Sequence, residues 1–139
     1  MREVLENFCQ FYRVLDERPL SELELIYSDD IEFCDPVHCI HGMEDFRRYF
    51  EHLMQKVNHC RFDIDQVNEV GEQAFINWTM HFQHPALKRG DMISVDGLSH
   101  LKYDVKVYYH RDYFDLGAML YENIPLLGRF VKGVKKRLQ

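Results

Sequence analysis

The stretch AFINWTMHFQ, from residue 74 to residue 83, carries the clearest secondary-structure signal in the chain. Every second position in it is apolar, in the order Ala74, Ile76, Trp78, Met80 and Phe82. The intervening positions are polar or mixed. A period of two turns successive side chains to opposite faces of a β-strand. The stretch is therefore predicted to be a strand with one face on the hydrophobic core.

Further strands are predicted on both sides of this one. RFDIDQV, beginning at Arg61, precedes it and ends at the turn EVGEQ. After the loop HPALKRGD, the segments 92–103 and 105–115 also read as strands, separated by the turn YDVK. Short turns between successive strands are typical of antiparallel pairing. The second half of the chain therefore predicts three or four long antiparallel strands.

The first half of the chain is predicted to be mainly helical. Apolar residues recur at helical spacing from Val4 to Leu15 and from Phe46 to Val57. Between these segments, a short helix is expected after Pro19, with Ser21 and Glu24 spaced as a capping box. A short strand, 31–35, is expected to stop at Pro36.

Helices followed by strands indicate an α+β fold. We expect three N-terminal helices packed in a strongly curved antiparallel sheet that forms a conical barrel, followed by a short C-terminal helix. The cone would leave a hydrophobic pocket open at one end. The length favours one domain over residues 1–139, with 117–139 as a helical tail.

The composition narrows the possible partners. The chain has 139 residues, is 46% hydrophobic and 14% aromatic, and carries a net charge of −6. Nucleic acid is not an expected partner of such an acidic chain. No apolar run is long enough to span a bilayer, and MREVLENFCQFY lacks a signal region. We expect a cytoplasmic protein without a membrane partner.

The cysteines and histidines do not predict a metal site. The four cysteines show neither zinc-site spacing nor a C-x-x-C pair, so reduced thiols are expected. His38 and His41, or His81 and His84, can be drawn as ligand pairs, but in strands and loops this spacing does not define coordination. The sequence therefore predicts no metal and no cofactor.

Two short motifs resemble a known group of proteins. With the order of elements, YSDDIEFCDPV (27–37) and HRDYFDL (110–116) resemble the nuclear transport factor 2-like superfamily, which includes ketosteroid isomerases, SnoaL-like polyketide cyclases and limonene-epoxide hydrolases. By resemblance, Asp35 stands where the isomerases have their proton-shuttling base, and Asp112 where the hydrolases have the aspartate that activates water. The resemblance also implies a cystatin-like α+β barrel and a homodimer paired through the outer sheet face.

The sequence departs from both of these constellations. Phe11 occupies the position of the isomerase oxyanion tyrosine, and Tyr12 beside it is expected to face elsewhere. Ser99 replaces the second, acidic oxyanion donor, and Trp78 and Met80 replace the arginine and aspartate of the hydrolases. Neither set of catalytic residues is complete.

The motif HRDYFDL places three residues on each face of the last strand: His110, Asp112 and Phe114 against Arg111, Tyr113 and Asp115. Both faces mix aromatic and charged groups, so the pattern alone does not decide which is interior. The resemblance turns Asp112 inward, to share a cavity with Asp35.

We expect Asp35, Asp112 and His110 to perform general acid/base catalysis on a small apolar metabolite. An apolar surrounding favours the neutral form of a carboxyl and so suits it to proton transfer near neutral pH. The other predicted ligand-binding residues are Phe11, Phe33, Trp78, Met80, Phe82 and Ser99.

Two functions remain open at this stage. The first is a cofactor-independent isomerase, cyclase or hydrolase. The second is a non-catalytic ligand-binding or protein-interaction domain, in which Asp35 forms a turn before Pro36 and Asp112 only bonds His110 or a backbone amide. Carboxyl groups on opposite faces would exclude the first.

The basic tail GRFVKGVKKRLQ, 128–139, predicts an amphipathic helix. Phe130, Val134 and Leu138 share one face, and lysines and arginines surround the other. Such a helix is expected to pack on the barrel or cover the pocket mouth. The alternative is that it lies on an anionic membrane.

Overall fold

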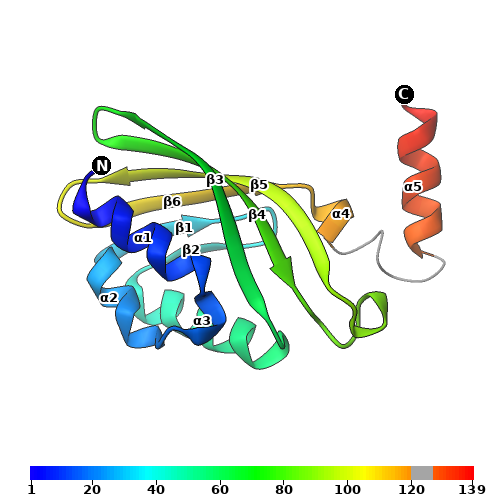
Figure 1. The fold of residues 1–139 in the computed structure, drawn as a ribbon, viewed down its shortest axis with the longest axis horizontal. Helices are drawn as coiled ribbons and strands as arrows, with labels where there is room; N and C mark the ends of the chain where they lie inside the picture. The colour runs from blue at the N-terminus through cyan, green and yellow to red at the C-terminus, as the bar shows by residue number, and fades with distance from the viewer. Residues whose placement is uncertain (120–126) are drawn as a thin grey trace.

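The computed structural model describes residues 1–119 and 127–139 and has the predicted α+β architecture. Its strands form one six-stranded sheet in the order β2-β1-β6-β5-β4-β3 (Figure 1). The strands are β1 (Tyr27–Cys34), β2 (Cys39–His41), β3 (Cys60–Val70), β4 (Gln73–Phe82), β5 (Ile93–Tyr103) and β6 (Val107–Phe114). Strands β3 to β6 are antiparallel neighbours, as predicted.

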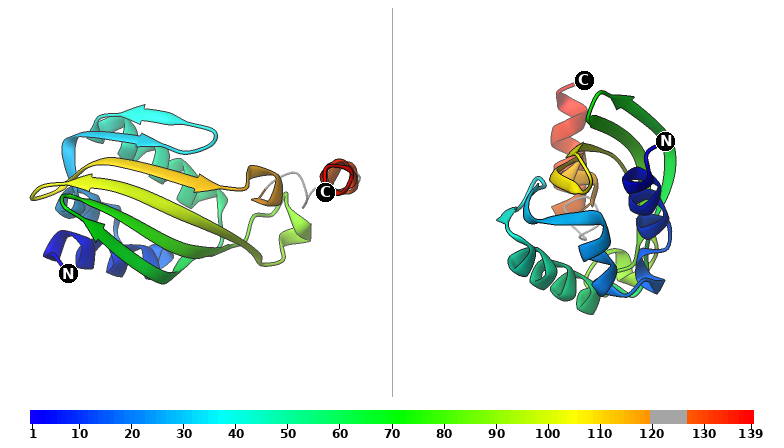
Figure 2. Two further views of the ribbon diagram at one scale, coloured as in Figure 1. Left: turned by 90° about the horizontal axis from the view of Figure 1, so that it is seen from above. Right: turned by 90° about the vertical axis from the view of Figure 1, so that its left-hand side faces the viewer.

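The helices pack mainly against the concave side of this curved sheet, which does not close into a complete barrel (Figure 2). They are α1 (Glu3–Arg13), α2 (Leu23–Ile26), α3 (Met43–Lys56), α4 (Leu116–Met119) and α5 (Leu127–Arg137). Three 3₁₀ turns complete the described elements: Leu15–Glu17, Leu20–Glu22 and Lys88–Gly90.

The start of α3 depends on Gly42, which precedes it with a φ of 90°. A side chain is strained at positive φ, so glycine suits this position. Glu44 and Asp45 in the first turn place negative charge at the helix N-terminus, where the helix dipole favours it. The predicted third helix is confirmed, and Phe46 and Phe50 are its buried face.

The short first strand differs from its prediction in extent and pairing. It begins at Tyr27 rather than residue 31 and pairs in parallel with β6, bringing Phe33 opposite His110. A second short strand, β2, returns antiparallel to it and was not predicted. The predicted capping box is also wrong, because a 3₁₀ turn precedes α2 and the helix has no side-chain cap.

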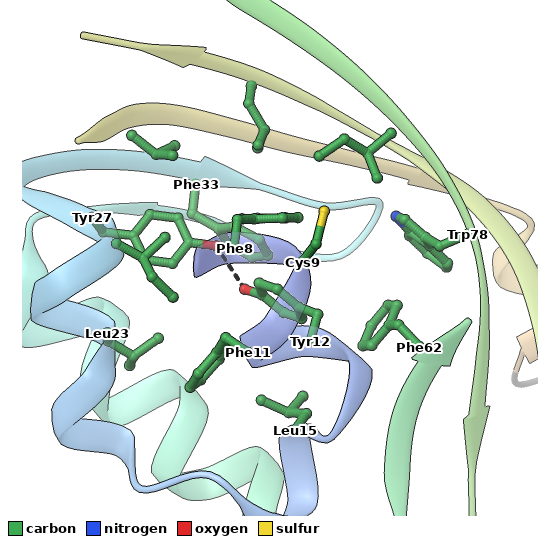
Figure 3. Packing of buried hydrophobic residues seen from close by; sticks show 14 of the residues in the cluster. Phe8, Cys9, Phe11, Tyr12, Leu15, Leu23, Tyr27, Phe33, Phe62 and Trp78 are labelled. Carbon is green, nitrogen blue, oxygen red and sulfur yellow. Dashed lines mark hydrogen bonds between the residues drawn. The ribbon is translucent and has the colours of Figure 1, made fainter. Parts of the chain in front are cut away.

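The core lies between the sheet and the first three helices. Phe8, Phe11 and Leu15 from the N-terminal segment contribute to it, all at most 2% exposed. On β4, the five residues of the apolar face predicted from the sequence point to this core, and four of them are buried. Figure 3 shows the aromatic rings from α1 next to those of β1 and β3, with Trp78 of β4 beside Phe62.

The C-terminal region is only partly described. The predicted tail, 117–139, contains the end of α4 and all of α5, while its residues 120–126 lie outside the described residues. In the described part of the chain, no helix is long and apolar enough to cross a membrane.

The expectation of reduced thiols is wrong for one pair of cysteines. Cys34 at the end of β1 and Cys39 at the start of β2 are partners in the strand register and form a disulfide. Their separation of 5 residues gave no hint of this, because only the unpredicted hairpin brings the two together. Cys9 and Cys60 are free and buried.

The short helix α2 offers a matched test of this packing. Leu23 is fully buried, whereas Leu25, two positions away, is 66% exposed. Leu23→Ala should lower the free energy of unfolding by about 2–5 kcal/mol, because it removes buried methyl groups and leaves a cavity. Leu25→Ala should change it by less than about 0.5 kcal/mol. Denaturant unfolding of both variants checks this, and equal losses would contradict it.

The disulfide predicts a definite thiol count. Unfolded without reductant, the protein should react with a thiol reagent at two sites, Cys9 and Cys60. After reduction, all four cysteines should react. A Cys34→Ser, Cys39→Ser variant should give two sites under both conditions. Four reactive thiols in the unreduced wild type would contradict the disulfide.

Candidate functional site

A cavity of about 340 Å³ lies between the helices and the sheet. Its wall is mostly aromatic and aliphatic, with a few polar groups. It is formed by Tyr12, Leu15, Phe33, Asp35, Val37, His38, Tyr49, Phe50, His52, Leu53, Lys56, Cys60, Phe62, Trp78, Met80, Asp112 and Phe114. Pockets of this character typically bind small organic molecules, with the polar groups fixing their orientation.

Strand β6 turns Asp112 toward this cavity. Successive side chains of the strand alternate between faces, and the side chains of His110 and Asp112 are 1% and 15% exposed. Arg111 and Tyr113 lie on the opposite, exposed face, where the guanidinium group of Arg111 lies over the Tyr113 ring. The structure thus decides what the mixed pattern of HRDYFDL left open.

The Asp112 carboxylate is held from two sides. Ser99 lies opposite Asp112 in the β5–β6 register, and its Oγ donates to Asp112 Oδ1 at 2.5 Å. His110 Nε2 lies 2.6 Å from the same oxygen. Trp78 Nε1 in turn donates to Ser99 Oγ at 2.8 Å. These contacts fix the carboxylate at the cavity wall with little freedom to rotate.

The hydrogen-bonded chain continues behind His110 to a second point on the wall. His110 Nδ1 lies 2.8 Å from the hydroxyl of Tyr27, which lies 2.6 Å from the hydroxyl of Tyr12. Figure 3 shows the two tyrosine hydroxyls facing one another, Tyr12 from α1 and Tyr27 from the start of β1. Tyr12 and Asp112 both line the cavity, so both ends of the chain reach it.

Burial keeps both tyrosines in their neutral form. Desolvation raises the pKa of Tyr12 and the pKa of Tyr27 well above the usual value for a phenol. A neutral hydroxyl both donates and accepts one hydrogen bond. Each tyrosine can therefore pass a hydrogen bond along the chain in either direction.

Asp35 also reaches the cavity, but it has a structural role. Its Oδ1 accepts the backbone N–H groups of Val37 and His38 at 2.8 and 2.7 Å, which shapes the turn between β1 and β2. Its Oδ2 accepts the Tyr49 hydroxyl at 3.0 Å. Desolvation, followed by the Asp35 charge, raises the pKa of Tyr49, so that hydroxyl remains a donor.

The structure brings some predicted ligand-binding residues to the cavity and separates others from it. Phe33, Trp78 and Met80 line it together with Asp35 and Asp112. The remaining predicted residues are not among its lining residues: Phe11 and Phe82 are buried in the core, and Ser99 and His110 lie behind Asp112.

The sequence analysis missed both tyrosines of the chain. Tyr12 was expected to face away from the pocket, yet it lines the cavity, while the neighbouring Phe11 is fully buried. The spacing of Phe8 and Tyr12, four residues apart on α1, was an available signal, because residues at this spacing share a helix face. Tyr27 had no signal, since its partner His110 is 83 residues away.

The histidine pairs do not assemble a metal site. His81 lies between Ser94 and Asp63, and the imidazole of His38 lies 3.5 Å from Asp35. Across residues 1–119 and 127–139, no group of three or more potential metal ligands occurs.

Gly97 makes room for the indole ring of Trp78. The two residues are partners in the β4–β5 register. A Cβ atom at Gly97 would lie 2.6 Å from Cζ2 and Cζ3 of Trp78, a distance that real Cβ atoms essentially never show. The bare backbone at Gly97 therefore lets Trp78 lie flat across the sheet and reach Ser99.

The comparisons with known proteins agree with this fold. The sequence model of the SnoaL-like domain matches residues 8–106. No curated protein matches the sequence. The chain is similar in structure to a putative SnoaL-like polyketide cyclase from Shewanella putrefaciens, with 21% identity, a TM-score of 0.71, and coverage of 86% of this chain and 94% of that one.

Two further solved structures show the same likeness. An NTF2-like protein of unknown function from Burkholderia pseudomallei is 16% identical, with a TM-score of 0.77 over 90% of this chain and 99% of that one. An LEH-like epoxide hydrolase from M. tuberculosis is 16% identical, with a TM-score of 0.67 over 84% of this chain and 83% of that one. At these identities the likeness establishes the fold and not the reaction.

Replacing Gly97 tests how the wall is built. Gly97→Ala should displace the indole of Trp78, weaken its bond to Ser99, and lower the free energy of unfolding by about 1–3 kcal/mol, as overpacking does. Trp78 is the only tryptophan, so its fluorescence reports the displacement directly. Gly133→Ala is the control, because nothing lies within 4 Å of a Cβ there. An unchanged emission spectrum in Gly97→Ala would contradict this account.

Proposed function

The chain belongs to the SnoaL-like domain family, and from this premise we propose that its pocket binds a small, largely apolar molecule and transfers a proton on it by general acid/base catalysis. The observation that carries the proposal is the hydrogen-bonded chain Tyr12–Tyr27–His110–Asp112, both ends of which line one cavity. A chain with only one end at the cavity would serve as a structural anchor.

Asp112 is the proposed base. With neutral His110 donating from Nε2 and Ser99 donating from Oγ, the carboxylate is held as an acceptor at the wall. His110 Nδ1 then accepts the Tyr27 hydroxyl, which accepts that of Tyr12. In this arrangement every hydrogen bond points toward Asp112, and the Tyr12 side chain at the other end of the chain also lines the cavity.

Asp112 takes up the proton that it abstracts from the ligand and becomes the neutral carboxylic acid. The same carboxyl then returns a proton to another atom of the ligand, so the site ends each turnover with its starting charge. The chain behind Asp112 moves no proton: the Tyr27 hydroxyl, by donating to Nδ1 of His110, holds the imidazole in the tautomer that donates from Nε2 to Asp112. This is the balance required for an isomerisation or a ring closure.

The structural neighbours support an organic ligand. The protein from Shewanella putrefaciens is described as a putative polyketide cyclase and the M. tuberculosis protein as an epoxide hydrolase. TerC, 17% identical with a TM-score of 0.72, was co-crystallised with polyporic acid. An aromatic-lined cavity of about 340 Å³ suits a molecule of this general kind.

Ligand binding without catalysis is the second candidate, and one observation favours it. Asp35 is committed to the turn before β2, so the site holds one available carboxylate rather than the expected pair. In that case Asp112 and its partners would only stabilise the pocket wall.

Turnover by two variants separates the candidates. A ligand is first found by a thermal-shift or native mass-spectrometry screen of hydrophobic metabolites. Asp112→Asn should keep that ligand but lower kcat by about 100-fold or more, the usual contribution of a general base. Tyr27→Phe should lower kcat with KM unchanged, because Tyr27 belongs to the chain but does not line the cavity.

Two conservative substitutions on the outer side of the sheet are the controls. Asp96→Asn and Tyr108→Phe alter exposed residues of β5 and β6 and should leave both constants unchanged. A ligand that binds the wild type and Asp112→Asn equally, with no turnover by either, would establish the binding function instead. Full activity of Tyr27→Phe would exclude a catalytic role for the hydrogen-bonded chain behind Asp112.

A further inference from the structure

Helix α5 stands apart from the core of the domain and exposes an apolar row. It extends beyond the end of the sheet where β6 ends (Figure 1). The row consists of Phe130 and Val134 on α5 and Leu138 directly after it, spaced four residues apart. Their exposed fractions are 69%, 42% and 83%. The apolar row does not pack on the sheet, and no described residue of α5 is among the residues that line the cavity.

The other sides of α5 are strongly basic. Residues 127–139 hold five cations and no acidic residue: Arg129, Lys132, Lys135, Lys136 and Arg137. Lys135 is paired with Asp115 at 2.6 Å, which ties the helix to the end of β6. Among the residues that the structure describes, none forms an ion pair with the other four. A local excess of positive charge in a chain of net charge −6 points to an anionic partner.

We propose that α5 lies on the surface of an anionic phospholipid bilayer. Phe130, Val134 and Leu138 would enter the boundary between headgroups and acyl chains, and the basic residues would contact the phosphate groups. Short helices that combine a basic face with an exposed apolar face bind membranes in this way, and both faces contribute to the affinity. An acidic protein or nucleic acid would neutralise the cations but leave the apolar row in water.

The position of α5 sets how the domain would face the lipid. The pocket wall includes Phe114 at the end of β6 and Val37 and His38 in the turn after β1. The end of β6 and the turn between β1 and β2 lie toward the end of the sheet beyond which α5 stands (Figure 2). Docking through α5 therefore turns the pocket end of the domain toward the membrane rather than away from it.

Flotation of the full-length protein with vesicles tests the proposal. One vesicle contains phosphatidylcholine alone, and the other contains phosphatidylcholine and phosphatidylglycerol in equal parts. The protein should float with the anionic vesicle at low salt, float poorly with the neutral one, and dissociate as salt is raised. Lys132→Gln with Lys136→Gln should weaken binding by about 30-fold, as expected for two cations near an anionic surface.

Matched variants separate the helix from general charge effects. Lys102→Gln with Lys106→Gln removes the same charge from the end of β5 and the loop between β5 and β6, at the opposite end of the sheet from α5 (Figure 1), and should leave binding within about twofold. Phe130→Ser should also weaken binding to the anionic vesicle. In Phe130→Trp, the new indole should shift its emission to shorter wavelength on that vesicle, against the constant signal of buried Trp78.

Three results would overturn the proposal. The first is no flotation of the wild type with anionic vesicles at low salt. The second is equal loss of binding in the loop variant and the helix variant. The third is an α5-dependent dimer in light scattering with no vesicle binding, which would make a second copy of the chain the occupant of the apolar row. Far-ultraviolet circular dichroism of each variant confirms that it is folded.

Discussion

The hydrogen bond between His110 and Asp112 is the constraint around which the interior is organised. The His110 ring is 1% exposed and lies among the rings of Phe8, Tyr12, Tyr27 and Phe33. An imidazole in such surroundings is tolerated only when its nitrogens are hydrogen-bonded, and here both are, to Asp112 and to Tyr27. The bond from His110 to Tyr27 therefore joins β6 to β1, and the bond from Tyr27 to Tyr12 joins β1 to α1.

The antiparallel part of the fold followed from the sequence because its cause is local. Alternation along β4 and β5 reflects burial of one face, which any strand on a core must show. The parallel pairing of β1 with β6 could not be predicted in the same way. Its contacts join residues such as Phe33 and His110, far apart in the chain, and nothing in either segment specifies its partner. The disulfide was missed for the same reason, because it depends on a strand of three residues.

The candidate site was predictable in its residue types but not in its connections. Alternation placed His110 and Asp112 on one face, and the resemblance indicated which face was interior. The sequence could not show that one oxygen of Asp35 would accept hydrogen bonds from two backbone amides. This leaves Asp112 as the available carboxylate. Nor could it show Tyr12 and Tyr27 as partners, because hydroxyl contacts depend on how a helix is rotated against the sheet.

The Gly97–Trp78 contact helps to set the volume of the cavity. The indole fills space above a residue without a side chain, so the two positions share a fixed volume. A smaller aromatic residue at position 78 would enlarge the cavity. A larger residue at position 97 would fill part of the volume that the indole had occupied. Paired exchange at these two sites would change the volume open to a bound molecule, but it would also remove the indole donor from Ser99, which holds Asp112. The size of the molecules admitted and the hold on the proposed base are therefore coupled, and descendants of this sequence could not alter the first without affecting the second.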